Sequence, residues 1–569
     1  MTKRYLNLDP RLIKKYHQDI VFNYAEYPTC DHWSYEFNSE DYKKSLVDWI
    51  PKNPDKKITF YVHIPFCEQL CWFCTCSKTI TNDYEKVKDY LKYLYKEIDL
   101  LFDYLNENKI KLNVGTVYFG GGSPTILNRE DLKNLVDKLK NLFDWSNVGN
   151  FTIESDPRRV DEDRLIYNAK VCGANRISFG MQDFDVNVQR RVNRIQPAEL
   201  FEKILTKEVR KLYKTIAFDL LVGQPAQTPE SMAKTCDKIN ELKPTLVQVS
   251  LMAYKPWVAK YSLKMVAEGP LPDFLERKEM MDVIDEKLIA GGYVRVGFES
   301  YALPDDPMNK AFNDRTAWYA ATGHQPGGRV NYIAVGSSSK MNLGDDYYAQ
   351  NFYDIQAYKK CLDKGKFPIF RGMKLSKDDA IRQHATQHIK SFLGIDFKYF
   401  KEYFQIDAKE YFKKELESLG EMVKDGIVTV SNEGIKLTKI GEDFSQNVAN
   451  VFDKYDPPNK SDADFRVPRH REVDGSAPDI IYPMMPREGK NMGDFWDEHV
   501  VKTAVAKNTR SPDRLEHPAP FPEQIVTVPV LQTTDEGDLV LDPFSGSNTT
   551  GRVANRYGRK YVGYDVQVY

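Results

Sequence analysis

Short apolar runs alternate with amphipathic stretches along the first half of the chain. Residues 57–64 form an apolar run that predicts a buried strand, and residues 83–105 repeat apolar side chains every three or four positions, which predicts a long helix. Further strands, most of them followed by a helical pattern, are predicted at 114–122, 150–157, 175–183, 215–223 and 245–253. Because strands that alternate with helices are typical of parallel β/α units, we expect an α/β fold from residue 57 to about 255.

The pattern changes after about residue 365. Helical patterns come first, and residues 425–444 then predict a short two-strand wing between helices, which indicates a small winged-helix-like module. Residues 454–515 are rich in Pro, Asp, Lys and Arg with little periodicity, so they are predicted to be a linker. Residues 523–566 return to an α/β pattern of helix, strand, small-residue turn, helix and strand.

Composition excludes several classes of protein. With 41% hydrophobic and 28% charged residues among 569, the chain can build a large core and is not disordered as a whole. The formal net charge of −2 gives no overall basic signature for nucleic acid, although a local basic patch remains possible. No apolar run approaches the roughly 18 residues of a membrane span, and no apolar stretch follows the N-terminal charges as in a secretory signal. We expect a cytoplasmic protein without a membrane partner.

Four of the eight cysteines crowd into ten residues: Cys67, Cys71, Cys74 and Cys76. Three thiolates on one short loop can hold three irons of a [4Fe–4S] cluster and leave the fourth iron open to a substrate or cofactor. Zinc is the alternative, although zinc usually takes two separated ligand pairs, and no second Cys/His pair follows nearby. The cluster of cysteines therefore predicts a metal or redox site.

The cysteine loop belongs to a longer set of motifs. YVHIPFCEQLCWFCTC (61–76) is followed by FGGGSPT (119–125), IESDPRRV (153–160), a stretch beginning NRISFGMQD at 175 and FDLLVGQPAQTPES (218–231). In this order the motifs resemble those of the radical S-adenosylmethionine (SAM) superfamily and, more narrowly, of the oxygen-independent coproporphyrinogen III oxidases. The resemblance covers roughly residues 10–455.

This resemblance implies a chemistry and a set of binding residues. The implied activity is one-electron reduction of a cluster-bound SAM, which is cleaved to a 5′-deoxyadenosyl radical that abstracts hydrogen, with an electron donor such as flavodoxin or ferredoxin. The resemblance assigns the cluster to Cys67, Cys71 and Cys74, and leaves Cys76 as an extra cysteine. Tyr61, Phe73, Gly121 and Glu154 match the first SAM site. Gly122, Ser123, Gln182, Arg194, Asp219 and Ala253 match positions that hold a second SAM in the family.

Several positions depart from the family pattern. The arginine of an N-terminal Arg-Tyr-x-x-Tyr-Pro-Thr motif is lost in residues 23–29, and Lys340 stands where the family has isoleucine beside the first SAM. Residues 318–324 replace an aromatic loop, and Val222-Gly-Gln-Pro225 replaces a Tyr-Gly-Leu-Pro turn. Because the propionates of a porphyrinogen need cationic or hydrogen-bonding partners, these changes predict an altered substrate, with a tetrapyrrole-like or an unknown small molecule both open.

The last residues resemble a different family. HPAPFPEQIV (517–526) and the stretch 539–566 are similar to the end of DNA methyltransferases of the N4-cytosine/N6-adenine type. A strand ending at Asp542, a turn containing Gly546 and a second strand ending at Asp565 would suit a further SAM, since the small turn admits its methionine part and the last carboxylate its ribose. The base-binding tetrad of such enzymes has one candidate, residues 456–459, which lacks the aromatic residue, so we interpret it as linker.

The expected fold class is α/β: a partial (β/α) radical SAM barrel, a helical, winged-helix-like module and a short, incomplete Rossmann-like methyltransferase segment. The expected segments are an N-terminal extension packing on the barrel (1–56), the barrel core (57–364), the module (365–453), the linker (454–515) and the methyltransferase-like segment (516–569).

The sequence is consistent with four functions. The first is a radical SAM enzyme with altered substrate choice, and the second is decarboxylation of coproporphyrinogen III itself. The third is nucleic-acid modification through the tail, helped by the basic run 466–475. The fourth is a SAM- or haem-binding protein without turnover.

Overall fold

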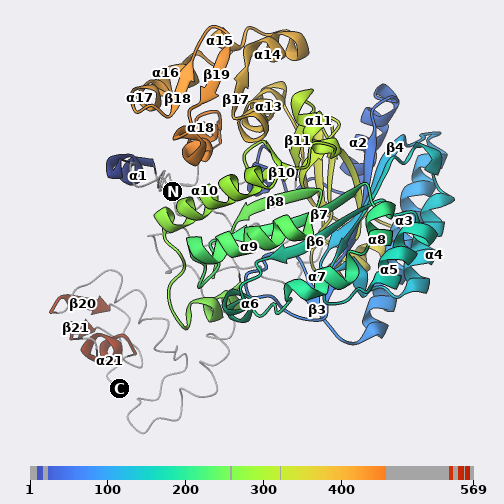
Figure 1. Ribbon diagram of the computed structural model, residues 1–569, viewed down its shortest axis with the longest axis horizontal. Coiled ribbons are helices and arrows are strands. Elements are labelled where there is room, and N and C mark those ends of the chain that lie inside the picture. The colour runs from blue at the N-terminus through green and yellow to red at the C-terminus, as the bar shows by residue number, and fades with distance from the viewer. Residues whose placement is uncertain are drawn as a thin grey trace. The chain divides into compact units, whose positions relative to one another are not determined.

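The computed structural model describes residues 9–16, 24–256, 259–320, 322–455, 537–542, 549–556 and 558–563 (Figure 1). Two compact units divide the chain. The larger is built on Met1–Pro457, and the smaller includes Asp479–Tyr569. Among the described helices, none combines the length and the apolar character that crossing a bilayer would require.

Twelve of the described strands of the larger unit form one sheet, in the order β16-β15-β14-β13-β1-β4-β5-β6-β7-β8-β10-β9. Its central strands run parallel to one another: β13 (Asn331–Val335), β1 (Ile58–Ile64), β4 (Val114–Gly121), β5 (Asn150–Ser155), β6 (Arg176–Gln182), β7 (Thr215–Val222) and β8 (Leu246–Leu251). The predicted α/β fold is confirmed. Since all seven strands point the same way, their carboxyl ends and the loops that follow them gather at one edge of the sheet.

Alternation along the strands separates a helix-covered face from a polar inner face. In β6, Ile177, Phe179 and Met181 are buried, whereas Ser178 and Gln182 line a cavity on the inner face. Helices cover the outer face (Figure 1): α3 (Tyr84–Glu107), α4 (Arg129–Lys140), α5 (Glu162–Tyr167), α7 (Ala198–Ile204), α8 (Lys207–Leu212), α9 (Pro229–Leu242) and α10 (Phe274–Ala290). The helix predicted at 83–105 is α3, which begins after Asp83, whose side chain accepts a hydrogen bond from the backbone N–H of Glu85.

Antiparallel strands extend the sheet at both edges. β14 (Lys340–Leu343), β15 (Tyr347–Asn351) and β16 (Ile369–Lys374) follow β13, and β10 (Ser300–Ala302) and β9 (Val294–Val296) follow β8. The sequence pattern predicted that the barrel core ends at residue 364. β16 lies after that residue and still belongs to the main sheet, because it pairs with β15. A separate hairpin, β11 (Ala317–Ala320) and β12 (Gly323–Pro326), occupies the segment where the family's aromatic loop is missing.

The N-terminal segment packs along the β15–β16 edge. Ser34 and Gly372 exchange two backbone hydrogen bonds of 2.8 and 2.9 Å, and the Trp33 ring stacks on Tyr348 with centroids 4.8 Å apart. Helix α2 (Ser39–Trp49) follows, with Asn38 as its N-cap. Residues far apart in sequence are thereby brought to one wall of the sheet.

The helical module carries a small sheet. The predicted wing is β18 (Val428–Val430) and β19 (Gly434–Leu437), and β17 (Gly394–Asp396), which the sequence did not indicate, pairs with β19. Around it lie α13 (Lys377–Phe392), α14 (Phe397–Phe404), α15 (Ala408–Tyr411), α16 (Lys413–Ser418), α17 (Gly420–Lys424) and α18 (Ser445–Val451). The short helix α1 (Pro10–Tyr16) joins the module through Tyr16, whose hydroxyl donates to Asp425 at 2.6 Å.

In the smaller unit the described residues form a parallel pair of strands and a helix. β20 (Leu539–Asp542) pairs with β21 (Lys560–Gly563), and α21 (Thr549–Arg556) lies between them in the chain. This is the strand–helix–strand order that the sequence predicted. Gly546, Asp565, the tetrad candidate 456–459 and the basic run 466–475 lie outside the described residues.

Candidate functional site

The four clustered cysteines lie on the loop that follows β1. The loop carries the short strands β2 (Phe66–Cys67) and β3 (Thr79–Ile80), which pair in parallel. Together with residues at the carboxyl ends of β4, β5 and β6, all four cysteines line one cavity of about 260 Å³, here called the cluster cavity. None of the eight cysteines forms a disulfide, so all four sulfur atoms of the loop are available.

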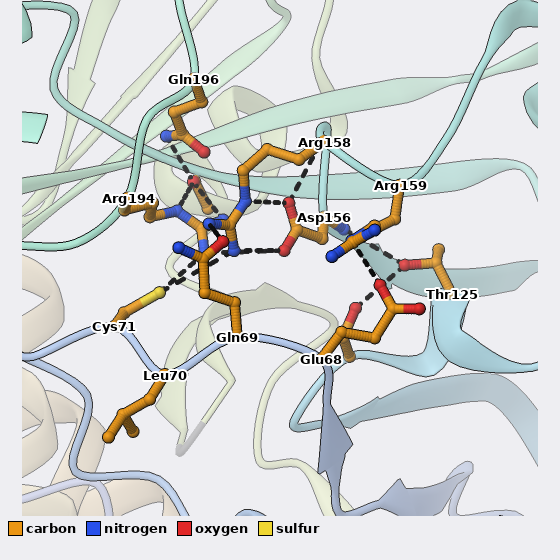
Figure 2. Close-up of polar contacts among 12 residues, drawn as sticks. Glu68, Gln69, Leu70, Cys71, Thr125, Asp156, Arg158, Arg159, Arg194 and Gln196 are labelled. Carbon is orange, nitrogen blue, oxygen red and sulfur yellow. Dashed lines mark hydrogen bonds and ion pairs between the residues drawn. The ribbon is translucent and has the colours of Figure 1, made fainter. Parts of the chain in front are cut away.

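Two arginines approach Cys71 (Figure 2): Arg158 from the segment after β5, and Arg194 from the segment between α6 (Val186–Arg191) and α7. Arg194 Nη1 lies 3.3 Å and Arg158 Nη2 3.9 Å from the Cys71 sulfur. Asp156 holds Arg158 through an ion pair of 2.6 Å and lies 3.8 Å from Arg194. The two guanidinium groups place positive charge beside this sulfur, which suits a sulfur that binds a metal.

Burial acts differently on the neighbouring thiols. It raises the pKa of Cys67 to about 12, with the other cysteines adding to the shift. The pKa of Cys74 falls to about 6, first because the Cys76 side chain donates to it and then because Lys78 and Arg194 lie nearby, although burial opposes the shift. A group that binds thiolates would remove the proton from Cys67 on binding.

Glu154 and the glycines of β4 shape the space next to the loop. Glu154 accepts hydrogen bonds from the Tyr118 hydroxyl at 2.9 Å and from the Gly121 N–H at 3.2 Å, and burial raises its pKa to about 7. At Gly122 a Cβ atom would meet the backbone oxygen of Phe66 at 2.7 Å. The backbone at Gly122 therefore passes so close to β2 that no side chain fits there, and this packing holds the start of the cysteine loop against the end of β4.

A second cavity of about 470 Å³, here called the lumen cavity, extends along the inner face of β5–β8. Asp219 of β7 lies in its wall, where it accepts from the Ser178 hydroxyl at 2.9 Å, and burial raises its pKa to about 6. The hairpin β11–β12 contributes Tyr319 and Gln325 to the same cavity. The segment that replaces the family's aromatic loop thus still lines the interior.

A third cavity, of about 400 Å³ and here called the aromatic cavity, lies against the N-terminal segment. Trp33, Trp318 and Tyr332 line it, and Lys340 forms an ion pair of 2.6 Å with Glu26 in its wall. Glu154 and Cys76 line all three cavities. The three spaces therefore meet beside the cysteine loop.

The structure brings most of the sequence-predicted residues together. In the cluster cavity lie Cys67, Cys71, Phe73, Cys74, Gly121, Gly122, Ser123, Glu154, Gln182, Arg194 and Asp219. Tyr61 lines the aromatic cavity beside Gly121 and Glu154, and Ala253 lines the lumen cavity beside Gln182 and Asp219. Asp542 ends β20 in the smaller unit.

Some residues of the site were not singled out from the sequence. Asp156 and Arg158 lie within IESDPRRV, so their motif was noticed but not their contact with Cys71. Glu26 stood at a variable position of the N-terminal motif, and its pairing with Lys340, more than 300 residues away, has no sequence signal.

The residues present fit an iron–sulfur cluster better than a single metal ion. Among the described residues no three His, Cys, Asp or Glu side chains converge on one point as a mononuclear site requires. The three cysteines of a cubane cluster each take a different iron and need not converge. Four thiols, three cations and the backbone of three glycines border one cavity, which is a donor set that suits a cluster with a SAM beside it.

The comparisons with known proteins point the same way. The family description "Radical SAM superfamily" matches residues 61–239, and "DNA methylase" matches residues 337–568. The second match takes in β14–β16, which belong to the main sheet, as well as the smaller unit.

Curated relatives cover most of the larger unit. The oxygen-independent coproporphyrinogen III oxidase of Helicobacter pylori is 31% identical over 435 residues, which are 76% of this chain and 93% of the relative. The Pseudomonas aeruginosa protein of the same name is 32% identical over 452 residues, 79% of this chain and 96% of the relative.

A solved structure extends the likeness to the fold. Coproporphyrinogen III oxidase from Escherichia coli, a radical SAM enzyme, matches with a TM-score of 0.71 and 30% identity over 79% of this chain and 99% of that one. Membership of this group implies a [4Fe–4S] cluster and SAM as cofactors. The chain belongs to the oxygen-independent coproporphyrinogen III oxidase family of radical SAM oxidoreductases.

Proposed function

We propose that this chain oxidises a carboxylate-bearing tetrapyrrole of the coproporphyrinogen type, by abstraction of a hydrogen atom from its side chain. The observation that carries the proposal is the meeting of three cavities at Glu154 and Cys76, beside the cysteine loop. When bound, the cluster and SAM supply a 5′-deoxyadenosyl radical. The electron is proposed to come from a carrier such as flavodoxin or ferredoxin.

The chain's own residues hold and orient these groups. Cys67, Cys71 and Cys74 would bind the cluster, and Arg158 and Arg194 would offset its thiolate charge at Cys71. Tyr61, Phe73, Gly121 and Glu154 would hold the first SAM. Glu154 would accept hydrogen bonds from its ligand while the Tyr118 hydroxyl fixes the carboxyl group in place.

A second SAM is proposed for the space between the cluster and lumen cavities. Gln182 and Asp219 line both cavities, and Ala253 lines the lumen cavity. Gly122, Ser123 and Arg194 would complete the site from the cluster side.

The aromatic cavity is proposed to take the substrate ring. Its walls are aromatic, which suits the apolar pyrrole rings of such a macrocycle, and it opens onto Glu154. The Lys340–Glu26 pair supplies one cation and one anion there, so the wall is close to neutral. An unpaired arginine at this wall would bind a substrate carboxylate. We infer that this chain, which has an ion pair there instead, accepts a substrate with fewer carboxylates facing the wall.

The test uses the full chain, reconstituted anaerobically with iron and sulfide and reduced with dithionite. We expect 5′-deoxyadenosine from SAM. With a one-electron acceptor added to take the electron that the substrate radical releases together with CO2, we expect a carboxyl-depleted product from coproporphyrinogen III by mass spectrometry. SAM cleavage with coproporphyrinogen left intact would keep the radical chemistry and reject the substrate. Protein that holds a cluster and SAM but never cleaves SAM would instead be a binding protein, and the proposal would fail.

A second candidate function rests on the smaller unit. The parallel strands β20 and β21 with α21 and the match to DNA methylases favour a further SAM site, with Asp542, Gly546 and Asp565 as proposed binding residues, and a nucleic-acid partner. Methyl transfer from labelled SAM to duplex DNA, measured at low salt, tests this function. If neither methylation nor DNA binding occurs at low salt, the candidate is rejected, because phosphate contacts are strongest there.

A further inference from the structure

Arg176 is a buried cation that lines a cavity, and its side chain has no hydrogen-bonding partner among the residues that the structure describes. It is the first residue of β6, is 6% exposed, and lines the lumen cavity. Within the described part of the chain no hydrogen bond, ion pair or aromatic ring reaches its guanidinium group. Since buried charges are normally paired, and an unpaired one is costly, this side chain calls for an anion that the protein itself does not provide.

Asp306 is the acidic residue that acts on Arg176, and its oxygens are already occupied. Its Oδ2 atom accepts from the Thr215 hydroxyl at 3.2 Å and from the Thr245 hydroxyl at 2.7 Å, and its Oδ1 accepts from the Met308 N–H at 2.9 Å. Burial is the main influence on Arg176 and lowers its pKa, and Asp306, followed by Tyr118, opposes this shift. Asp306 therefore serves the loop before α11 (Pro307–Asn313) rather than the arginine.

The position of Arg176 along β6 places it far from the cysteine loop. Thr152 of β5 and Thr215 of β7 are its register partners, and both line the lumen cavity. Gly180 follows four residues later in the same strand and lines the cluster cavity, which puts about 13 Å between the two backbones. A ligand that bridges this distance has to be as long as a tetrapyrrole side arm with its ring, or as SAM in an extended form.

Charge along the lumen orients such a ligand. Glu154 and Asp219 lie in the cavity wall toward the carboxyl ends of the strands, and Arg176 lies at their amino ends. Arg158 and Arg194 line the cluster cavity and not the lumen cavity, so Arg176 is the one cation among the described residues that line the lumen cavity. Its planar guanidinium offers two parallel N–H donors that match a carboxylate.

We propose that Arg176 binds a carboxylate group of a ligand that enters the lumen cavity, either a side-chain carboxylate of the substrate or the methionyl carboxylate of a second SAM. The inference rests on the proposed function, because it names the group that the same interior recognises. Thr152 and Thr215 flank the carboxylate and narrow the end of the cavity.

The first test is the stability of the protein without ligand. In Arg176→Met the unpaired charge is gone, so we expect a melting temperature equal to or above that of the wild type. Arg164→Met is the matched control. Arg164 donates to the Leu127 carbonyl and to Asn168, and its loss leaves acceptors without a donor, so its melting temperature should fall. A fall in Arg176→Met as large as in the control would show a structural role and overturn the inference.

The second test measures binding by anaerobic equilibrium dialysis of the cluster-loaded enzyme, without turnover. One arm uses SAM and decarboxylated SAM, and the other uses coproporphyrinogen III and its tetramethyl ester. We expect Arg176→Met to weaken binding of one carboxylate-bearing probe by about 10- to 100-fold, the effect of losing a charged hydrogen-bonding pair, and to leave binding of its carboxylate-free analogue unchanged. Arg176→Lys should recover part of the loss.

The arm that responds identifies the ligand. A lower count of bound SAM per chain assigns Arg176 to a second SAM, and weaker binding of coproporphyrinogen assigns it to the substrate. If neither probe binds more weakly to Arg176→Met, the inference is wrong. Failure of the proposed function is seen separately, as absence of 5′-deoxyadenosine from the wild-type enzyme.

Discussion

Two walls of the same interior differ in how closely they follow their family. The wall formed by the cysteine loop and the ends of β4–β6 carries the residues proposed to hold a cluster and SAM, and the structure gathers them around one cavity. The wall formed by the N-terminal segment and β13–β14 replaces an arginine-containing motif and an isoleucine by the ion pair of Glu26 and Lys340. Glu154 lies in both walls.

The difference separates chemistry from substrate choice. Radical generation needs fixed ligands at fixed positions, because the cofactors carry the reactive atoms and the protein orients them. Recognition of the substrate needs only a complementary wall, and a wall can change its charge and shape without touching the cluster. We therefore expect changes to the first wall to abolish SAM cleavage, and changes to the second to alter what is oxidised.

The largest effect is expected from the cysteine loop. Cys71→Ala should lose the cluster and with it 5′-deoxyadenosine formation, because one of three iron ligands is gone. Cys76→Ala should keep its iron and sulfide content, because the remaining three cysteines still supply every ligand. Iron and sulfide analysis with the visible absorbance of both variants makes the comparison, and equal iron loss in both variants would contradict the three-ligand assignment.

The next effect concerns the backbone that approaches the cofactor. In Gly122→Ala the new Cβ would lie 2.7 Å from the Phe66 oxygen, so β4 and β2 must move apart. We expect the KM for SAM to rise about 10-fold or more, with the cluster retained. Gly420→Ala is the control, since among the described residues nothing lies within 4 Å of a Cβ there and the backbone is not in the left-handed region. An unchanged KM in Gly122→Ala would show that the close approach serves packing alone.

The substrate wall should respond more selectively. Lys340→Ile restores the family residue but leaves Glu26 without its partner, so the double variant with Glu26→Gln is the proper test. We expect it to cleave SAM at the wild-type rate and to change the ratio of coproporphyrinogen consumed per 5′-deoxyadenosine formed. If both quantities fall together, the pair belongs to the radical machinery, and the contrast between the walls is lost.

The smallest effect concerns stability behind the substrate wall. Glu97 of α3 accepts from the Tyr358 hydroxyl and from the Gly336 N–H, both at 2.6 Å, and thereby holds the turn that leads to Lys340. Burial raises the pKa of Glu97 from 4.5 to about 7. Between these values the native state binds more protons than the unfolded state, so the free energy of unfolding should fall as pH rises through this window.

Glu97→Gln removes this titration. Between pH 4.5 and 8 the free energy of unfolding of the wild type should fall by roughly 3 kcal/mol relative to that of the variant. Denaturant unfolding at both pH values measures this change. A difference that is independent of pH would contradict the raised pKa.

Sequence patterns predicted the parallel strands and the cysteine loop because both are local. The run 57–64 became β1, and the spacing of Cys67, Cys71 and Cys74 placed three sulfur atoms on one loop before any tertiary contact was known. The unpredicted features depend on long-range contacts. β17 needs β19 as its partner, β16 is held by β15 and Ser34, and Glu26 meets Lys340 only once the N-terminal segment lies along the sheet edge.

Arg176 illustrates a middle case. Its place in NRISFGMQD was visible in the sequence, and alternation along the strand would put it on the same face as Ser178 and Gln182. That no acceptor among the described residues reaches its guanidinium group becomes clear only when the partners of Asp306 are known.

The most direct test of the account is electron paramagnetic resonance of the dithionite-reduced enzyme, recorded with and without SAM. If Cys67, Cys71 and Cys74 hold a cluster with one open iron, SAM should bind at that iron and shift the spectrum of the reduced [4Fe–4S]⁺ state. A spectrum that SAM leaves unchanged, or protein that carries zinc in place of iron, would contradict the central claim.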